Sequence, residues 1–237
     1  MNRSAIALWF ATVAVAQRPP MPRAEPVYLL GEFATARVEC TADSTVLQAF
    51  VAGNARATAA LDAVVLLRAR GERDSVCVVV DVRRMILTGN TATNVMLAPG
   101  DILFAPPQPA EGMGPWQPDT LHDAVLASVL AANDLPVRLR ASALRETLVR
   151  TSDPVVRHDT ALAIAALPDR LLAVQHLVAV LPRDPAVVRE ALVALATMGG
   201  DAASAVPELK CLLDHRDPTL RALAAAAVRQ IGAAGKQ

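Results

Sequence analysis

The stretch "NVMLAPGDILFAPP", from Asn94 to Pro107, decides how the first half of the chain folds. Pro99 and Gly100 are a turn signal, because proline presets φ and glycine tolerates a positive φ. Asp101 can accept backbone N–H groups at such a turn. The apolar run that follows predicts a short strand over Asp101 to Pro106, and two consecutive prolines end it because they cannot extend a hydrogen-bonded ladder.

Side chains alternate between the two faces of a strand. Ile102 and Phe104 are therefore expected on one face of the sheet, and Leu103 on the other. The turn swings the chain back so that this strand closes the sheet.

The residues before this stretch contain further strand-like and helix-like runs. Ser44 is a candidate N-cap of the one amphipathic helix and Gly53 its terminator. A mixed sheet that packs one face on this helix is an α+β fold. The runs are a hairpin at Val27–Phe33 and Thr35–Cys40, the helix at Ser44–Gly53, strands at Ala63–Gly71 and Ser75–Val82 joined by a polar turn, "ERD", and a short helix or turn at Arg83–Asn90.

Together, "YLLGEF", "TVLQAFVAGN", "VVLLRARG", "VVVDVRRMILTGN" and "NVMLAPGDILFAPP" resemble an SLBB domain, the β-grasp module of bacterial polysaccharide export proteins. The most specific part is the closing pattern, which ends in Ile-x-x-x-Pro. The resemblance covers Val27 to Pro107, about a third of the chain. The matching positions are Asp81, Gly89, Asn94, Leu97 and Pro99-Gly100-Asp101.

Two features depart from that family. The Pro-Gly that usually follows the first Gly-Glu is missing after Gly31-Glu32, and the usual paired glycines after the helix are reduced to Gly53-Asn54. Export proteins of this kind also carry an export domain before the first SLBB module, whereas only a linker precedes it here. The chain is therefore not expected to form an export channel alone.

The second half reads as helical throughout. After a linker at 108–118, residues 119–237 contain three segments that start with Asp-Pro, at Asp153, Asp184 and Asp217. Asp as N-cap followed by Pro at the first helical position is a strong helix start. The period is about 30 residues, which indicates a solenoid. These segments resemble HEAT repeats of the short bacterial type, with three repeats and a final helix.

The N-terminus has the layout of a secretory signal peptide. A short positive start precedes the 12-residue apolar run Ala5–Ala16, and Ala14-Val15-Ala16 is a cleavage pattern. Residues 1–16 are thus expected to be removed, leaving an exported chain that begins at Gln17 with no membrane span, since a span needs about 20 apolar residues. A buried or interfacial N-terminal helix is the alternative. Residues 17–26 hold four prolines and predict an extended linker.

Composition and motifs exclude several function classes. The chain contains 23 Lys and Arg residues in total and 23 Asp and Glu residues. This balance of charge argues against a protein dedicated to nucleic-acid binding, which usually has a concentrated basic face. No metal-ligand spacing, phosphate-binding loop or nucleophile elbow occurs, so no cofactor, metal or enzymatic activity is expected. Cys40 and Cys77 can pair if their strands are neighbours, or all three cysteines, with Cys211, are small buried hydrophobes.

Candidate binding residues are few. Arg157, Arg189 and Arg221 recur at intervals of 32 residues. They either form a basic strip for an anionic glycan or acidic partner, or a structural ladder in which each arginine ties to a neighbouring repeat. Trp116 lies in the linker and is either exposed or staples the domains together. With 3% aromatics, a sugar-stacking platform is disfavoured.

The resemblance implies an exported, non-enzymatic accessory of envelope polysaccharide export, with other SLBB-containing export proteins or a polysaccharide as partners. The alternative is a protein–protein interaction scaffold whose solenoid binds a partner. Oligomeric state does not follow from the sequence.

Overall fold

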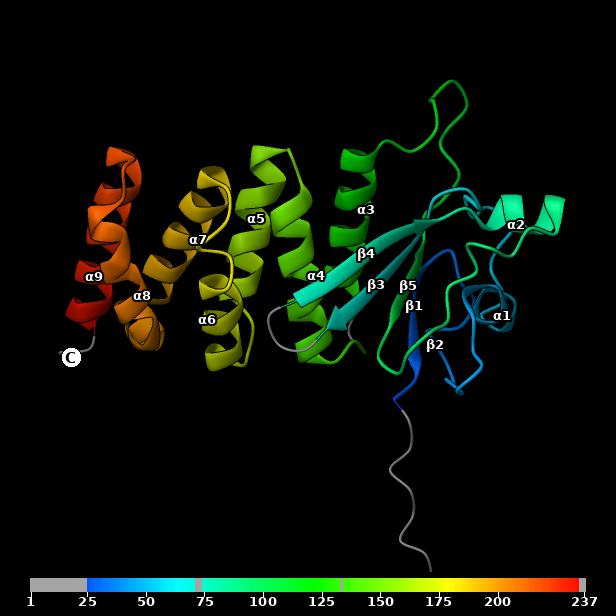
Figure 1. Ribbon diagram of the computed structural model, residues 1–237, viewed down its shortest axis with the longest axis horizontal. Coiled ribbons are helices and arrows are strands. Elements are labelled where there is room, and N and C mark those ends of the chain that lie inside the picture. The colour runs from blue at the N-terminus through cyan, green and yellow to red at the C-terminus, as the bar shows by residue number, and fades with distance from the viewer. Residues whose placement is uncertain (1–24, 71–73, 133, 235–237) are drawn as a thin grey trace, which may run out of the picture.

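The computed structural model describes residues 25–70, 74–132 and 134–234. The expected signal peptide, most of the first linker and the tip of the "ERD" turn lie outside these residues. The chain has a mixed α+β architecture, with a five-stranded sheet in the N-terminal half and a helical C-terminal half (Figure 1). No helix within the described ranges is both long and apolar enough to cross a membrane.

The sheet has the strand order β2-β1-β5-β3-β4. β5 lies between β1, which runs parallel to it, and β3, which runs antiparallel, so the last strand is inserted at the centre. β2 pairs antiparallel with β1, confirming the first hairpin, although β2 has only two residues. The strands are β1 (Val27–Gly31), β2 (Arg37–Val38), β3 (Val64–Arg70), β4 (Asp74–Val80) and β5 (Ile102–Ala105).

Two short helices cover one face of the sheet, where the sequence predicted one. α1 (Val46–Ala52) begins at Thr45, not at Ser44, because Thr45 forms a reciprocal capping box with Gln48. Gly53 ends this helix as predicted. α2 (Val82–Thr88) is capped by Asp81 and ends at Gly89, which has a φ of 66°. Both helices bury apolar side chains in the same core.

The other face of the sheet packs on the helical half. β5 alternates as predicted: Ile102 and Phe104 belong to the core shared with the helices, and Leu103 to the core under α1 and α2. The linker at 108–118 was expected to separate two cores, but one hydrophobic core crosses it. The physical reason is that β3 and β5 are apolar on both sides, so the second face must also be covered.

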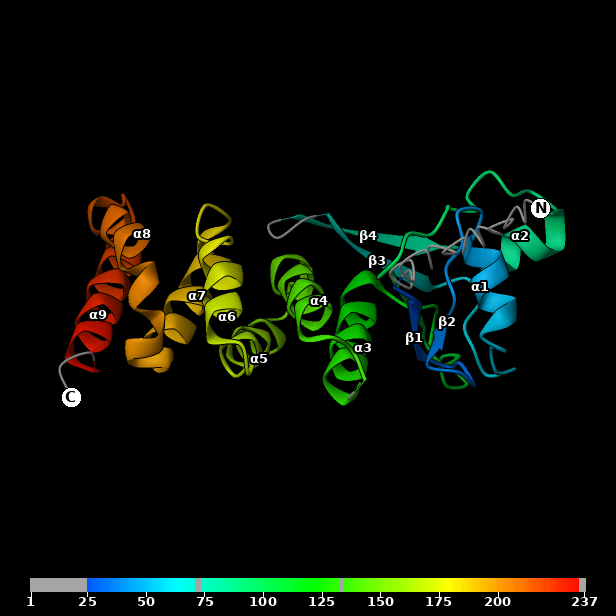
Figure 2. The ribbon, with the colours of Figure 1, turned by 90° about the horizontal axis from the view of Figure 1, so that it is seen from below.

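The helical half forms a row of helices beginning beside the sheet and ending at α9 (Figure 1), and Figure 2 shows the same row from below. Asp153, Asp184 and Asp217 each accept a backbone N–H of the helix they start, as predicted. The helices are α3 (Pro118–Ala131), α4 (Val137–Arg150), α5 (Pro154–Ala165), α6 (Arg170–Val178), α7 (Pro185–Met198), α8 (Val206–Cys211) and α9 (Pro218–Ala234), with 3-10 helices η1 (Gly199–Ala205) and η2 (Leu212–Asp214).

Candidate functional site

The Pro99-Gly100-Asp101 turn sits where the sheet meets the helices. Gly100 has a φ of 84°, as the sequence predicted, and its N–H donates to the Pro26 carbonyl at 3.1 Å. The Asp101 carbonyl accepts the Tyr28 N–H at 2.8 Å, which starts the pairing of β1 with β5. The turn thereby delivers β5 into the centre of the sheet.

Asp101 holds the turn with its carboxylate, which the sequence anticipated only in part. Its Oδ2 accepts the Ala98 N–H at 2.8 Å, as expected. It also receives two hydrogen bonds from Arg68 on β3, from Nε to Oδ1 at 2.9 Å and from Nη2 to Oδ2 at 2.7 Å. Asp101 is only 1% exposed. The two bonds make the pair bidentate. They raise the pKa of the Arg68 guanidinium further above its ordinary value.

The sequence contained a signal for this pair that pattern reading missed. Arg68 interrupts the apolar run of β3, and the register pairs Leu67 with Ile102, the residue after Asp101. Because β3 and β5 are antiparallel, the next step of this register places Arg68 directly opposite Asp101. That register depends on long-range strand pairing, which no local pattern specifies.

A cleft of about 380 Å³ lies between this turn and helices α4 and α6. Arg138 on α4 bonds Glu25 across it, tying the helical half to the segment before β1. The remaining lining is partly apolar. The full lining is Glu25, Arg68, Ala69, Ala98, Pro99, Gly100, Asp101, Arg138, Leu139, Ser142, Leu172 and His176.

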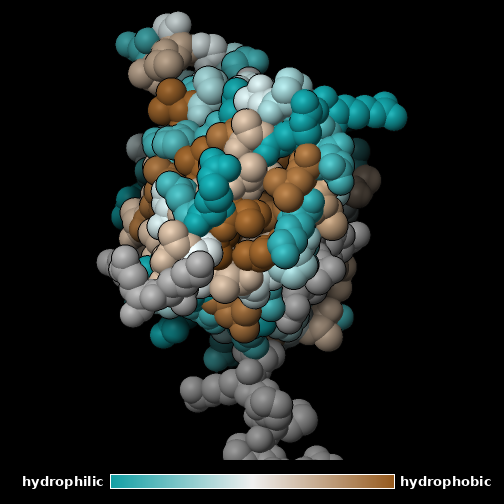
Figure 3. All heavy atoms as spheres, turned by 90° about the vertical axis from the view of Figure 1, so that its left-hand side faces the viewer, coloured by the Kyte–Doolittle hydropathy of each residue, from teal (hydrophilic) through white to brown (hydrophobic). Residues whose placement is uncertain are grey.

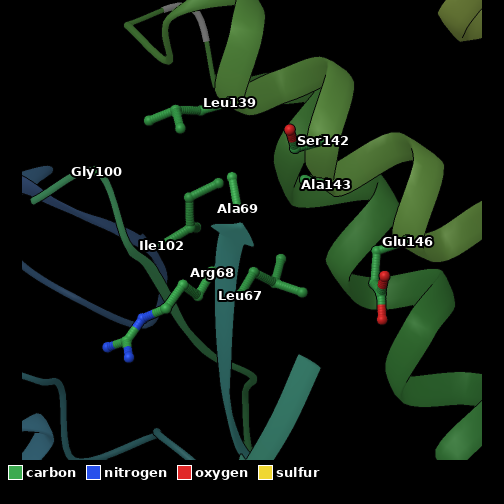
Figure 4. Close-up of a pocket in the computed structure, with 9 residues that line it drawn as sticks. All are labelled: Leu67, Arg68, Ala69, Gly100, Ile102, Leu139, Ser142, Ala143 and Glu146. Carbon is green, nitrogen blue, oxygen red and sulfur yellow. The ribbon is translucent and has the colours of Figure 1, made fainter. Parts of the chain in front are cut away.

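A smaller pocket lies directly between β3, β5 and α4 and shares several of these residues (Figure 4). Leu67 and Arg68 point to opposite sides of β3 in Figure 4, as strand geometry requires. Ile102 from β5 and Leu139 from α4 lie on the helix side. Apolar packing between sheet and helices thus forms the floor beneath the polar cleft.

His176 is the most unusual group in the cleft. It is 2% exposed, and its Nδ1 has no hydrogen-bond partner among the residues that the structure describes. Burial first, and the nearby charge of Arg145 second, lower the pKa of His176 to about 4. The imidazole is therefore neutral at ordinary pH. Ser142 also lines the cleft, but it does not bond Nδ1, so the two do not form a nucleophile–base pair.

The predicted arginine series does not converge on this site. Arg157 donates to the Thr151 carbonyl at 2.6 Å, and Arg221 donates to the His215 carbonyl at 2.7 Å. Each therefore binds a carbonyl at the end of the helix before its own, which is the type of contact that the structural interpretation expected. Arg189 is exposed and contacts only the adjacent Glu190 among the described residues, with Nε to Oε1 at 3.3 Å.

Glu190 links two helices that the arginine series was expected to join. Its Oε2 lies 2.9 Å from Nδ1 of His158, so α7 is tied to α5 through this pair. The sequence spacing that placed Arg157 and Arg189 in register also places His158 and Glu190 in register, one residue later. The cross-repeat contact thus exists, but through different side chains.

Trp116 staples the two halves of the chain. Its Nε1 donates to the Pro107 carbonyl at 2.8 Å, just after β5, and its ring packs against the core shared by sheet and helices. This matches the second of the two interpretations that the sequence left open.

The three cysteines are free. Cys40 belongs to the core under α1 and α2, whereas Cys77 packs against the other core, so the sheet separates them. Burial raises the pKa of both thiols, that of Cys77 to about 11. Cys211 is exposed, so the interpretation as three buried hydrophobes is wrong for that residue.

Within the residues that the structure describes, no group of three His, Cys, Asp or Glu side chains is placed to hold a metal ion. The cleft instead offers paired charges, one hydroxyl and one neutral imidazole, which suits hydrogen-bonded recognition of a ligand. Family models, curated proteins and solved structures were compared with this chain, and none matches it.

Proposed function

We propose that this chain is an exported, non-enzymatic binding protein that assists envelope polysaccharide export through its N-terminal half. The support is the resemblance of Val27–Pro107 to SLBB modules, together with a sheet that suits a β-grasp. A hairpin is followed by a helix that packs on the sheet, and a last strand runs parallel to β1 at the sheet centre. The turn that closes the SLBB pattern is also the turn that lines the cleft.

The helical half fits a short HEAT-like array in this proposal. Asp-capped helices start at regular intervals, and α5, α7 and α9 contact one another in turn. In such an array each repeat contacts only its neighbours, so the first helices can pack on an adjacent domain while the remaining helices stay free to bind a partner. Here α3 and α4 cover the sheet, and α6 contributes His176 to the cleft.

The observation that carries the proposal is the position of the cleft. Both halves of the chain line it, and the glycine turn and the buried Arg68–Asp101 pair shape one wall. Ligand sites in proteins occur preferentially at such junctions between domains. The described residues that line it do not form an acid–base or nucleophilic pair, which favours binding over catalysis.

Deletion of the gene in the source cell tests the function directly. We expect surface polysaccharide to fall several-fold and to return when the wild-type chain is supplied. The exported form should begin at Gln17 by mass spectrometry. Unchanged surface polysaccharide, or an intact Met1 terminus in the cytosol, contradicts the proposal.

A photo-crosslinking amino acid tests the partner. We place it at Leu87 on α2, at Met96 before the turn, and, as a control, at Leu171 on α6, all of which are exposed. The proposal expects an SLBB-containing export protein to be captured from Leu87 or Met96 but not from Leu171. Capture from Leu171 alone argues against docking through the N-terminal half.

A second candidate function is a scaffold in which the helical half binds a protein. The observation in its favour is the end of the row at α8 and α9, where apolar patches lie among polar ones on the surface (Figure 3). Leu213, on η2, is 38% exposed. A crosslinker at Leu213 that captures a partner, with none captured from Leu87 or Met96, favours this function.

A further inference from the structure

We infer that the cleft between the Pro99-Gly100-Asp101 turn and helices α4 and α6 binds an uncharged, polyhydroxylated ring, such as one neutral sugar unit. The inference rests on the proposed function, because it names the ligand class of the same site. Nothing in the SLBB resemblance assigns a ligand to this cleft, since the helical half supplies α4 and α6.

The charges of the cleft favour an uncharged ligand over a strongly charged one. Arg68 pairs with Asp101, and Arg138 pairs with Glu25, so the four ionised groups that line the cleft cancel. An anionic ligand needs an uncompensated cation, and a cationic ligand needs an uncompensated carboxylate. To bind either, the site must break an ion pair. Breaking the Arg68–Asp101 pair is unfavourable because Asp101 is buried, whereas the more exposed Arg138–Glu25 pair opposes a charged ligand less strongly.

Polar groups that favour hydroxyls are nevertheless present. Within the described part of the chain, Nδ1 of the buried His176 has no partner. A buried polar atom without a partner is costly unless a ligand or water satisfies it. The imidazole is neutral, so it offers a donor or an acceptor according to its tautomer. Ser142 lines the same cleft with a hydroxyl that can do both. A hydroxyl of the ligand can also donate or accept, so it fits this pair whichever tautomer is present.

The shape and the apolar lining suit the rest of a sugar ring. A volume of about 380 Å³ is near the lower end of the roughly 300–1,000 Å³ of small-molecule sites. Leu139, Leu172 and Ala98 give apolar surface for the C–H groups of the ring. None of the described residues that line the cleft is Phe, Tyr or Trp, so recognition by these residues depends on hydrogen bonds and not on stacking.

The test is a titration of the purified full chain, followed by NMR and calorimetry. The neutral probes are glucose, galactose and mannose and a neutral tetrasaccharide of each. Glucuronate and glucosamine are the charged counterparts. We expect saturable binding of at least one neutral probe with a dissociation constant on the order of 1 mM or tighter, and at least tenfold weaker binding of its charged counterpart. Tighter binding of a tetrasaccharide indicates a unit of a glycan chain, and tighter binding of the monosaccharide indicates a soluble sugar.

Two variants locate the site. Ser142→Ala removes one hydroxyl, and Ala98→Leu fills part of the cleft without removing a polar group. Each should weaken binding at least tenfold. Ala36→Leu is the matched control, because Ala36 is an exposed alanine that lines a separate groove beside β1 and α3. It should leave binding unchanged, and circular dichroism verifies that all three variants are folded.

Three results overturn the inference: no neutral probe binds, a charged probe binds more tightly, or both cleft variants bind like the control. The proposed function is judged separately by the gene deletion. If deletion lowers surface polysaccharide but no sugar binds, the inference is wrong and the function stands. If a neutral sugar binds in the cleft and deletion has no effect, the site stands and the export function is wrong.

Discussion

Replacing Asp101 by asparagine tests whether one buried carboxylate holds the closing turn of the sheet. Its two oxygens accept three hydrogen bonds, from Arg68 Nε at 2.9 Å, from Arg68 Nη2 at 2.7 Å and from the Ala98 amide at 2.8 Å. Asparagine keeps the shape but has a single acceptor oxygen. Its amide group also places two donors against a guanidinium that has only donors. At least one of the three bonds, and the charge, must be lost.

The expected cost follows from the exposure of the two partners. Removing one partner of a fully buried ion pair costs about 3–5 kcal/mol, and one hydrogen bond to a charged group contributes about 1.5–3 kcal/mol. Asp101 is buried, but the Arg68 side chain is 25% exposed and can regain water. We therefore expect Asp101→Asn to lower the free energy of unfolding by about 2–4 kcal/mol. For a chain of this size the melting temperature should fall by roughly 5–15 °C.

The assay is thermal and urea unfolding followed by circular dichroism. Asp201→Asn is the matched control, because Asp201 pairs with Arg170 at 3.4 Å with half of its side chain exposed. Such a surface pair contributes about 0–1 kcal/mol. A double-mutant cycle with Arg68→Met should give a coupling free energy of about 1–3 kcal/mol. The reasoning is refuted if Asp101→Asn unfolds like the control, or if the coupling is near zero.

Four other substitutions probe the junction and the helices. Gly100→Val should lower the free energy of unfolding by roughly 1–3 kcal/mol because Gly100 has a positive φ, and the new Cβ would lie 2.8 Å from a Glu25 oxygen and 3.7 Å from Leu139. Limited proteolysis should then cleave both halves of the chain together, because one core joins them. Cleavage of the sheet alone contradicts this prediction. Arg221→Ala should lower the free energy of unfolding by about 0.5–1.5 kcal/mol, whereas Arg189→Ala should change it by less than about 0.5 kcal/mol. Identical melting curves for the two variants contradict this prediction. His176 should make the chain less stable as pH falls from 6.5 to about 4, because the unfolded state takes up the proton first. The free energy of unfolding should fall by an amount on the order of 3 kcal/mol. A His176→Leu variant whose unfolding has the same pH dependence as the wild type contradicts this prediction.

The local elements were predictable because short-range chemistry specifies them. The positive φ of Gly100, the helix starts at Asp153 and Asp184 and the alternation along β5 all followed from residues within a few positions of one another. The α+β architecture followed in turn. The error at the start of α1, Ser44 in place of Thr45 as N-cap, arose because both side chains can cap and only Thr45 has Gln48 at the reciprocal position.

The cleft itself was decided by tertiary structure. Arg68 meets Asp101 only because β3 pairs with β5 in one register. His176 reaches the same cleft only because α6 packs against α4, which contacts the sheet. The core that crosses the linker was also decided by tertiary structure. The sequence indicates that both faces of the sheet are apolar and must be buried, but it does not indicate which element covers each face. Contacts between residues far apart in the sequence depend on how whole elements pack against one another. No short stretch of sequence specifies that packing, because it depends on all the contacts of the fold together.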